Sequence, residues 1–407
     1  MVLLLAFLAL LLAFVAFMTL GDAPQMVFKP PRWLVRVVFQ SRYVLIGLSM
    51  LLYLSAIIIH LIIAPINIVV LVVIGVLLVT LIFGAVFAVP RLLFPAIQRS
   101  PIWISREQAT TELAPDDFVL GIEVHGDARA YPTKWIMRPH IVCDSIGGEA
   151  VTMTYCMLSN LGKAFHTEID GKNMQLEVVM QLENNLVYYD RIRKQLIQQI
   201  NGAVLAGKEA RQPPTEYSTR SMPWSAWSTL YPTTRVFYNP PQPSRLSDRL
   251  VEKLLAVVMR AQYNMQTSRP AFPTIKHFDA RMHPKRSVIG VEHNGKHKAY
   301  SLEYLASQRV VNDVVDDLPV VAIYDSTHDI VDVFERTHNG AVLTFHPIST
   351  SLDFVLQDEE SQSQWNIKGE AIAGPAQGQR LQSYPHASRV LWMVWSNFFP
   401  DTQLAQR

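Results

Sequence analysis

Three long apolar stretches near the start of the chain limit its possible folds more than any other feature. Residues 2–20, 43–63 and 66–89 contain no Asp, Glu, Lys or Arg. An α-helix needs about twenty apolar residues to cross the hydrocarbon core of a bilayer, and each stretch has about that length. The sequence therefore predicts an α-helical membrane segment of three transmembrane helices within residues 1–100, with the lipid bilayer as a partner.

The first stretch has a competing interpretation as a cleaved signal peptide. Signal peptides begin with basic residues and end at small residues that form a cleavage site. No Lys or Arg precedes the apolar run, and the run is long. We therefore expect a retained helix, and a multi-pass protein of the cell membrane.

The charge distribution gives a prediction for orientation. Residues 21–42, between the first two stretches, contain one acid, Asp22. The basic residues in the same segment are Lys29, Arg32, Arg36 and Arg42. Because positive loops tend to stay in the cytoplasm, the rule places this loop there. Three crossings would then place the remainder of the chain on the same side.

The rest of the chain has the composition of an ordinary globular protein. Its full count of 36 basic and 34 acidic residues leaves a formal net charge of +2. No basic stripe with interleaved aromatics occurs, so we expect no nucleic-acid partner. The two cysteines, Cys143 and Cys156, exclude both a disulfide scaffold and a four-cysteine zinc site.

A segment of this globular part occurs twice. Residues 121–131 and 290–300 share Gly, Glu, Gly, Ala and Tyr at matching positions. A Trp-x-x-Trp segment also recurs, at Trp224 and Trp392. Alternating strands and Gly-rich turns dominate both copies, and each Trp-x-x-Trp segment predicts a short closing helix. We predict a mainly β (α+β) soluble part built from two diverged tandem repeats.

The predicted repeat units cover residues 118–238 and 287–404, and residues 239–286 link them. The linker starts with a Pro-rich stretch and continues with an amphipathic helix at residues 248–262. Apolar residues at helical spacing define its face: Leu250, Leu254, Val257, Val258 and Ala261. We expect this helix to cover one repeat unit, and the alternative is that it lies on the membrane surface.

Several short motifs resemble the DUF3179 family, whose function is unknown. They are Gly-Asp-Ala-Arg-Ala-Tyr-Pro at 126–132, His-Ile-Val-Cys-Asp at 140–144, Val-Thr-Met-Thr-Tyr-Cys at 151–156 and Gly-Glu-Ala-Ile-Ala-Gly-Pro at 369–375. The resemblance covers nearly all of residues 118–404. It also implies an extracytoplasmic location, since many relatives look exported or lipid-anchored, and this is opposite to what the charge rule favours.

The resemblance also draws attention to Cys156. Family members typically carry Tyr-Cys-Pro-x-Cys where this chain has Tyr155-Cys156-Met157-Leu158-Ser159. Only the first cysteine is kept, so dithiol redox exchange is disfavoured.

The repeat offset of 169 positions predicts a candidate site. It pairs His140 and Cys156 of the first unit with Arg309 and Asp325 of the second. Since Arg and Asp form natural ion pairs, we predict that the two positions face each other. The hairpin register then places His140 near Tyr155.

The same register places Cys143 opposite Thr152. Cys143 and Cys156 would then lie on the order of 13 Å apart along the strands, by the rise per strand residue. A disulfide needs Cα atoms within about 7 Å, so we predict no bridge between them.

Three interpretations of the Cys156–His140 pair stay open. The pair could bind copper or zinc, with Asp144 and Met153 completing the ligands. It could be a catalytic site in which His140 activates the Cys156 thiolate. It could also be a small buried thiol packed beside a histidine. We favour a metal- or small-ligand-binding module. The alternatives are a thiol-dependent enzyme and a non-catalytic assembly module, whose partner could be another membrane protein.

Overall fold

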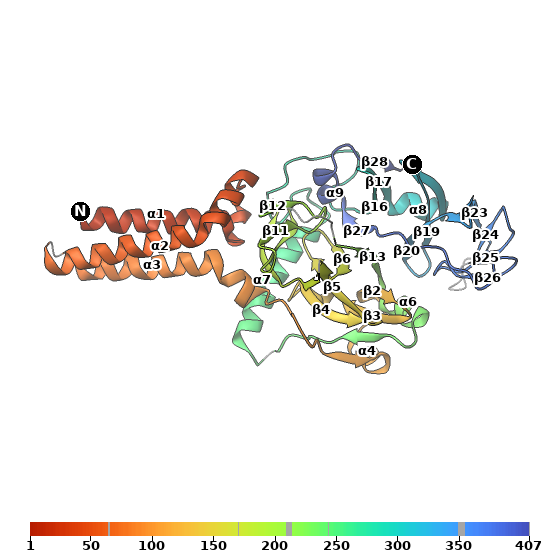
Figure 1. The fold of residues 1–407 in the computed structure, drawn as a ribbon, viewed down its shortest axis with the longest axis horizontal. Helices are drawn as coiled ribbons and strands as arrows, with labels where there is room; N and C mark the ends of the chain where they lie inside the picture. The colour runs from red at the N-terminus through yellow and green to blue at the C-terminus, as the bar shows by residue number, and fades with distance from the viewer. Residues whose placement is uncertain (64–65, 170, 209–213, 243, 349–354, 407) are drawn as a thin grey trace.

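Three apolar helices lie side by side and project from a β-rich part (Figure 1). The computed structural model describes residues 1–407 except 64–65, 170, 209–213, 243, 349–354 and 407. The helices are α1 (Val2–Leu20), α2 (Arg32–Ile62) and α3 (Ile68–Val86). Each is long and apolar enough to cross a membrane, as the sequence predicted. The sequence Ala-Pro-Ile-Asn at 64–67 predicts a tight turn between the second and third apolar stretches, and residues 64–65 of it lie outside the described residues.

Helix α2 begins at Arg32, well before the predicted start near Tyr43. Its 31 residues give a length of about 46 Å at 1.5 Å per residue, more than the roughly 30 Å hydrocarbon core requires. The extra turns pack against the β-rich part, where Val35 and Val38 are buried. The ring of Phe39 meets Tyr189 edge-to-face at 5.1 Å. The basic residues assigned to a loop from sequence therefore lie mostly on this helix.

Three sheets make up the first half of the β-rich part. A five-stranded sheet has the order β1 (Trp103–Ser105), β15 (Arg235–Phe237), β3 (Asp127–Pro132), β2 (Phe118–Val124) and β14 (Arg220–Pro223). A second sheet has the order β13 (Glu216–Tyr217), β6 (Leu161–His166), β5 (Glu149–Cys156) and β4 (Ile141–Ile146). A third, which packs against α2, has the order β12 (Val204–Ala206), β11 (Gln195–Gln198), β10 (Asn185–Asp190) and β9 (Leu176–Leu182).

The second half also contains three main sheets. The first has the order β27 (Ala387–Leu391), β16 (Ser287–His293), β17 (Lys296–Ser301) and β28 (Gln403–Ala405). The next has the order β18 (Val310–Val315), β19 (Leu318–Asp325) and β20 (Ile330–Glu335). The last has the order β23 (Phe345–Pro347), β24 (Leu356–Asp358), β25 (Gln364–Trp365) and β26 (Ala371–Ala373). Two small hairpins pair β7 (Glu168–Ile169) with β8 (Lys172–Asn173) and β21 (Thr337–His338) with β22 (Ala341–Val342).

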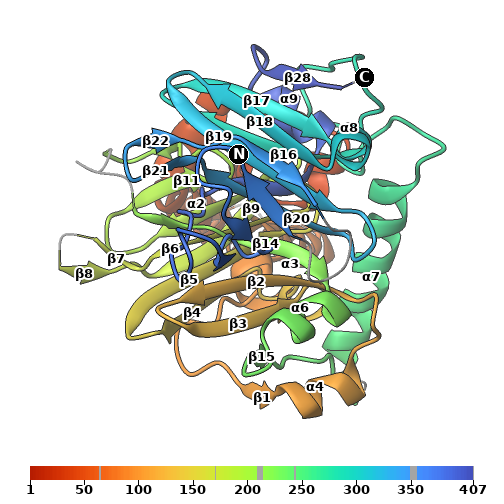
Figure 2. The same ribbon diagram turned by 90° about the vertical axis from the view of Figure 1, so that its right-hand side faces the viewer.

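In the part of the chain that the structure describes, seven short helices lie between the long helices or beside the sheets. They are η1 (Ala23–Met26), η2 (Ala88–Leu93), α4 (Arg106–Glu112), α5 (Thr133–Ile136), α6 (Trp224–Leu230), α8 (Leu302–Gln308) and α9 (Trp392–Phe398). The linker helix α7 (Leu246–Tyr263) starts slightly earlier than predicted. It lies at the end of the β-rich part from which the bundle projects (Figure 1) and at the side of the molecule (Figure 2). The two Trp-x-x-Trp segments form the predicted short helices, α6 and α9.

The strands of the two halves follow one another with a constant spacing. Phe118 and Ser287, which begin β2 and β16, are 169 positions apart, and β3–β8 precede β17–β22 by the same interval. Trp227 of α6 lies against Gly121, and Trp395 of α9 lies against Gly290. Neither glycine could carry a Cβ atom without overlapping the indole ring, which explains why both positions lack a side chain.

Candidate functional site

Cys156 and His140 lie at neighbouring ends of β5 and β4 and are fully buried. The backbone N–H of Tyr155 donates to the carbonyl of His140 at 2.8 Å, so the predicted adjacency is correct. His140 has a positive φ of 65° because the chain turns sharply between α5 and β4. The strand register, with Cys143 opposite Thr152, is also as predicted.

Gln181, on β9, lies between the two side chains. The Cys156 thiol donates to Oε1 of Gln181 at 3.2 Å, and Nε2 of Gln181 lies 3.1 Å from Nε2 of His140. Because the amide nitrogen can only donate, the imidazole Nε2 must accept. The imidazole ring also stacks on Phe94, with centroids 4.2 Å apart. The pair is thus joined through one amide.

The surroundings keep both groups neutral. Burial lowers the pKa of His140 to about 3 and raises the pKa of the Cys156 thiol above its usual value. An activated nucleophile needs the reverse, a thiolate stabilised by an imidazolium. This site therefore favours a neutral thiol and a neutral imidazole near pH 7.

The four predicted metal ligands do not point to one place. Directly opposed residues of an antiparallel pair share a face, and successive residues alternate between faces. The pairs Asp144–Val151 and Val142–Met153 put Asp144 and Met153 on one face of β4–β5. Cys156 belongs to the other face. Within the described residues, no cluster of three or more His, Cys, Asp or Glu side chains could hold a metal ion.

Both cysteines are free and buried. Cys143 lies beside Thr152, with its Sγ 3.5 Å from the hydroxyl oxygen, while Cys156 contacts Gln181 at the end of β5, four residues after Thr152. The two thiols therefore have separate surroundings, in keeping with the register from which the absence of a bridge was inferred.

A group of buried amides extends the site, and the sequence reasoning missed it. Its members are Gln181, Asn184, Asn185, Gln198 and Gln199. Asn185 donates to Oγ of Ser159 at 3.2 Å, and Gln199 donates to Oγ1 of Thr154 at 3.0 Å. The available signal was the largely polar run 181–185, which forms the turn between β9 and β10 yet is buried because this hairpin faces other segments.

The amide group is tied to the helix bundle. The backbone N–H of Gln181 donates to Asp22 at 2.9 Å, and burial raises the pKa of Asp22 to about 7. Glu183, in the turn after β9, forms ion pairs with Arg32 at 3.0 Å and with Lys276 at 2.7 Å. The Cys156–His140 pair therefore lies where the β-rich part is fastened to α1 and α2.

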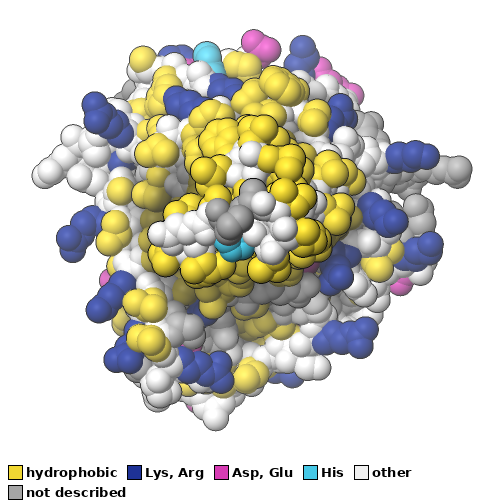
Figure 3. Space-filling view, turned by 90° about the vertical axis from the view of Figure 1, so that its left-hand side faces the viewer, with side chains coloured by type: hydrophobic (Ala, Val, Ile, Leu, Met, Phe, Trp, Pro, Cys, Tyr) yellow, Lys and Arg dark blue, Asp and Glu magenta, His cyan; other side chains and the backbone are white. Residues whose placement is uncertain are grey.

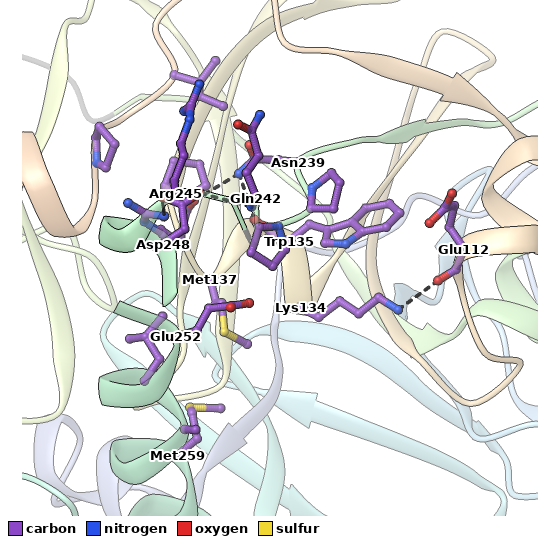
Figure 4. Close-up of a pocket in the computed structure, with 18 residues that line it drawn as sticks. Glu112, Lys134, Trp135, Met137, Asn239, Gln242, Arg245, Asp248, Glu252 and Met259 are labelled. Atoms are coloured by element: carbon purple, nitrogen blue, oxygen red, sulfur yellow. Dashed lines mark hydrogen bonds and ion pairs between the residues drawn. The ribbon is translucent and has the colours of Figure 1, made fainter. Parts of the chain in front are cut away.

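The structure contains a second candidate site, a pocket of about 780 Å³ between α7 and the first half (Figure 4). Asp248, Glu252 and Met259 of α7 line one side, and Trp135 and Lys134 face them. This volume falls within the roughly 300–1,000 Å³ range of small-molecule sites. Sequence reasoning did not find the pocket, since its walls come from segments far apart in the chain.

The pocket wall combines apolar surface with charges of both signs. The charged residues are Glu112, Lys134, Arg138, Arg245, Asp248 and Glu252. Arg138 pairs with Asp248 at 2.7 Å and donates to the carbonyl of Leu93 at 3.1 Å, so the wall is fixed to the chain that leaves α3. Trp135 supplies apolar surface. Such a lining suits a small molecule with an apolar body and a charged group.

Fold and site together define a protein with three membrane-length apolar helices, a β-rich part and a ligand-sized pocket. Residues 93–402 match the family described as "Protein of unknown function (DUF3179)". The chain belongs to this family, as its motifs predicted, and the matched region begins after α3. No curated protein and no solved structure was found to match the chain.

Proposed function

We propose that the chain is a membrane-spanning protein that binds a small ligand in the pocket between α7 and the first half. The observation that carries this proposal is the pocket's size of about 780 Å³ together with its mixed lining. Exposed side chains at Arg245, Glu252 and Ala256 border it, so a ligand can enter from the surface. Ligand sites usually combine an apolar wall with a few polar groups in this way.

In this proposal the Cys156–His140 pair has a structural role and does not bind the ligand. Both side chains are fully buried, both are neutral, and their shared partner Gln181 is bonded to Asp22. These contacts hold β9 between β5 and the base of the helix bundle. A thiol-dependent reaction would require a more exposed and more acidic thiol.

The test is to ask whether the pocket retains a small molecule. The full-length chain would be purified in mild detergent and examined by native mass spectrometry. Ala256→Trp fills the pocket, and Ala261→Trp on the same helix is the matched control because Ala261 does not line it. We expect a bound species in the parent and in Ala261→Trp, and its loss in Ala256→Trp. Equal occupancy in all three proteins would contradict the proposal.

A second candidate function places a soft metal, copper or zinc, on Cys156 and His140. One observation favours it: a neutral imidazole and a thiol approach the same amide, and both groups are suitable metal ligands. Metal analysis of the purified chain after dialysis against Cu(I) or Zn²⁺ tests this function. Cys156→Ala and His140→Ala should each abolish binding. Unchanged metal content in both variants would leave the pocket as the functional site.

We also infer that the two halves derive from one duplicated unit. The constant spacing of seven successive strands and the two Gly–Trp contacts support this inference. Each copy continues into a four-stranded sheet at the corresponding place, β9–β12 in the first and β23–β26 in the second, and the amide-rich sheet of the first copy faces the bundle. Ligand binding and attachment to the bundle then belong to the first copy.

In this fold the positive-inside rule is a weaker argument for a cytoplasmic location of the β-rich part. Arg32 pairs with Glu183, Arg36 donates to the carbonyl of Leu205 at 3.0 Å, and Arg42 lies over the ring of Tyr189. These arginines have structural partners, so their presence need not report the cytoplasm. We therefore propose the extracytoplasmic side that the family resemblance implies. An exposed cysteine that is labelled only after permeabilisation of cells would contradict it.

A further inference from the structure

An exposed apolar stripe runs along the linker helix α7. Leu246, Leu250, Leu254 and Val257 are 62%, 58%, 46% and 65% exposed, respectively. At about 100° per residue these positions lie within an arc of roughly 80°, and Ala261 falls in the same arc. A contiguous apolar stripe of this kind marks an interaction surface, whereas single exposed apolar residues need no explanation.

The stripe is not the face by which α7 is attached to the protein. Val251, Leu255 and Val258 lie on an adjacent side of the helix, centred roughly 110° away from the stripe at 100° per residue, and are buried in the main core. Gln262 accepts from the N–H of Ala271 at 2.7 Å and donates to the carbonyl of Leu158. The helix is therefore held firmly by one face, and the fold presents the other face outward.

Helix α7 lies at the same end of the β-rich part as the helix bundle, and to the side of the bundle (Figures 1 and 2). Figures 1 and 2 agree that its axis crosses the direction of the bundle. Asp248 of α7 pairs with Arg138, which in turn bonds to Leu93 just after α3. A bilayer around the bundle would end near α7, with the helix parallel to its plane.

Charge identifies the kind of surface that would meet the stripe. Arg249, Lys253 and Arg260 of α7 are exposed and fall on one flank of the stripe. Figure 3, which views the molecule from the bundle end, shows Lys and Arg side chains all around the apolar bundle and few acidic ones. Basic residues beside an apolar stripe are typical of helices that lie among anionic lipid headgroups.

We infer that α7 is an interfacial helix whose stripe enters the surface of the same bilayer that α1–α3 cross. Leu250, Leu254 and Val257 contact the outer parts of the acyl chains, and Arg249 and Lys253 contact anionic headgroups. The inference rests on the proposed membrane crossing, but it does not depend on which ligand the pocket binds. It also places the mouth of that pocket beside the lipid headgroups.

A second protein chain suits the apolar stripe of α7 less well than a lipid bilayer does. Stable protein interfaces use about 20–30 residues on each side, and the stripe offers only a few large side chains on one helix. A bilayer needs no matching shape, because lipid adapts to a narrow stripe. Lipid is also the partner that the basic flank and the nearby bundle both favour.

The test uses the full-length chain in vesicles of phosphatidylcholine and phosphatidylglycerol. Leu254→Cys carries an NBD fluorophore, and Ile372→Cys is the matched control. Ile372 is 42% exposed against 46% for Leu254, and it lies on β26, far from the bundle (Figure 1). The native cysteines are buried, so labelling selects the introduced thiol. The unsubstituted chain serves as the labelling blank.

The expected result is quenching at one position only. Lipids with a doxyl group near the headgroup should quench the Leu254 probe about twofold or more and shift its emission to the blue, since the probe enters the lipid. The Ile372 probe should change little. Equal quenching at both positions would overturn the inference. A blue shift without lipid quenching would mean that protein covers the stripe, and it would overturn the inference as well.

A charge variant tests the basic flank separately. Arg249→Glu with Lys253→Glu should weaken quenching of the Leu254 probe in vesicles rich in phosphatidylglycerol, because anionic headgroups then repel the flank. The same variant should behave like the parent in pure phosphatidylcholine. Quenching that does not respond to these charges in either lipid would refute the assignment of headgroup contacts.

Discussion

The two halves of the β-rich part hold the same backbone feature and use it differently. His140 and Arg309 both have positive φ values, 65° and 63°. In each half the next strand, β5 or β19, pairs back to this residue. Tyr155 and Tyr324 donate their backbone N–H groups to the carbonyls of His140 and Arg309, respectively, both at 2.8 Å. The turn is thus a property of the strand framework, independent of the side chain that it carries.

The side chains at the paired positions differ because their neighbours differ. Cys156 is covered by β9 and bonded to Gln181, whereas Asp325 binds the imidazole of His328 at 2.6 Å and the N–H of Thr327 at 2.9 Å. Among the described residues, the sheet that packs against the helix bundle is β9–β12 of the first half. Both halves continue into a four-stranded sheet, β9–β12 or β23–β26, so the comparison teaches that the framework fixes the geometry, while the residues and packing of that sheet decide whether the geometry becomes an attachment point.

The largest expected effect tests the shared framework. Trp227→Ala and Trp395→Ala should each lower the free energy of unfolding by about 3–5 kcal/mol, because each indole is buried against a glycine. Denaturant titration of the chain in detergent micelles measures this. Trp33→Ala is the control, since Trp33 is 66% exposed and should cost little. A large loss in only one half would break the equivalence of the two frameworks.

The next effect concerns the first half alone. Burial lowers the pKa of His140 to about 3 from its ordinary 6.5, so the unfolded chain binds the proton first as the pH falls. The stability contributed by neutral His140 is complete above pH 6.5 and is lost progressively towards pH 3. Between pH 6.5 and 5 the loss is about 2 kcal/mol, at 1.36 kcal/mol per pH unit.

Unfolding titrations at several pH values measure this dependence. His140→Gln should flatten the slope, and His125→Gln, at an exposed position of the same half, should leave it unchanged. If both variants kept the parent slope, His140 would have to be charged or accessible in the folded chain. The first half would then lack the buried neutral imidazole that distinguishes it from the second half.

The sequence was sufficient for the local elements and insufficient for their long-range contacts. Apolar length alone predicted α1 and α3, and turn residues predicted the β2–β3 and β4–β5 hairpins. The early start of α2 was missed because Arg32 and Arg36 resemble loop residues when their partners are unknown. Those partners, Glu183 and the carbonyl of Leu205, lie more than 150 positions away.

The candidate site was predicted in part for the same reason. The hairpin register follows from turn geometry, so the approach of His140 to Cys156 could be found from sequence. The register also separates Asp144 from Cys156, because alternate residues face opposite sides of a strand. Gln181 and the pocket could not be found, since β9 and α7 reach their places through tertiary packing that no local pattern records.

Glu183 offers a smaller test of the attachment between the first half and the bundle. Glu183→Gln removes ion pairs with Arg32 and Lys276, and these partners are 43% and 47% exposed, so much of the cost is screened by solvent. We expect a loss of about 1 kcal/mol that shrinks as salt is raised. Glu303→Gln, in an exposed pair with Arg286, should have no measurable effect. Equal effects from both variants would contradict a specific attachment.

The smallest effect isolates one hydrogen bond in the first half. In Cys156→Ser the hydroxyl can still donate to Oε1 of Gln181, whereas Cys156→Ala leaves that buried oxygen without its donor. Ala should therefore cost about 1 kcal/mol more than Ser, the usual value of such a bond. Unfolding titrations at pH 7 measure the difference. If Cys156→Ser and Cys156→Ala lowered the free energy of unfolding equally, the thiol would contribute by its volume alone. Position 156 would then differ from position 325 of the second half in packing and not in hydrogen bonding to a neighbouring sheet.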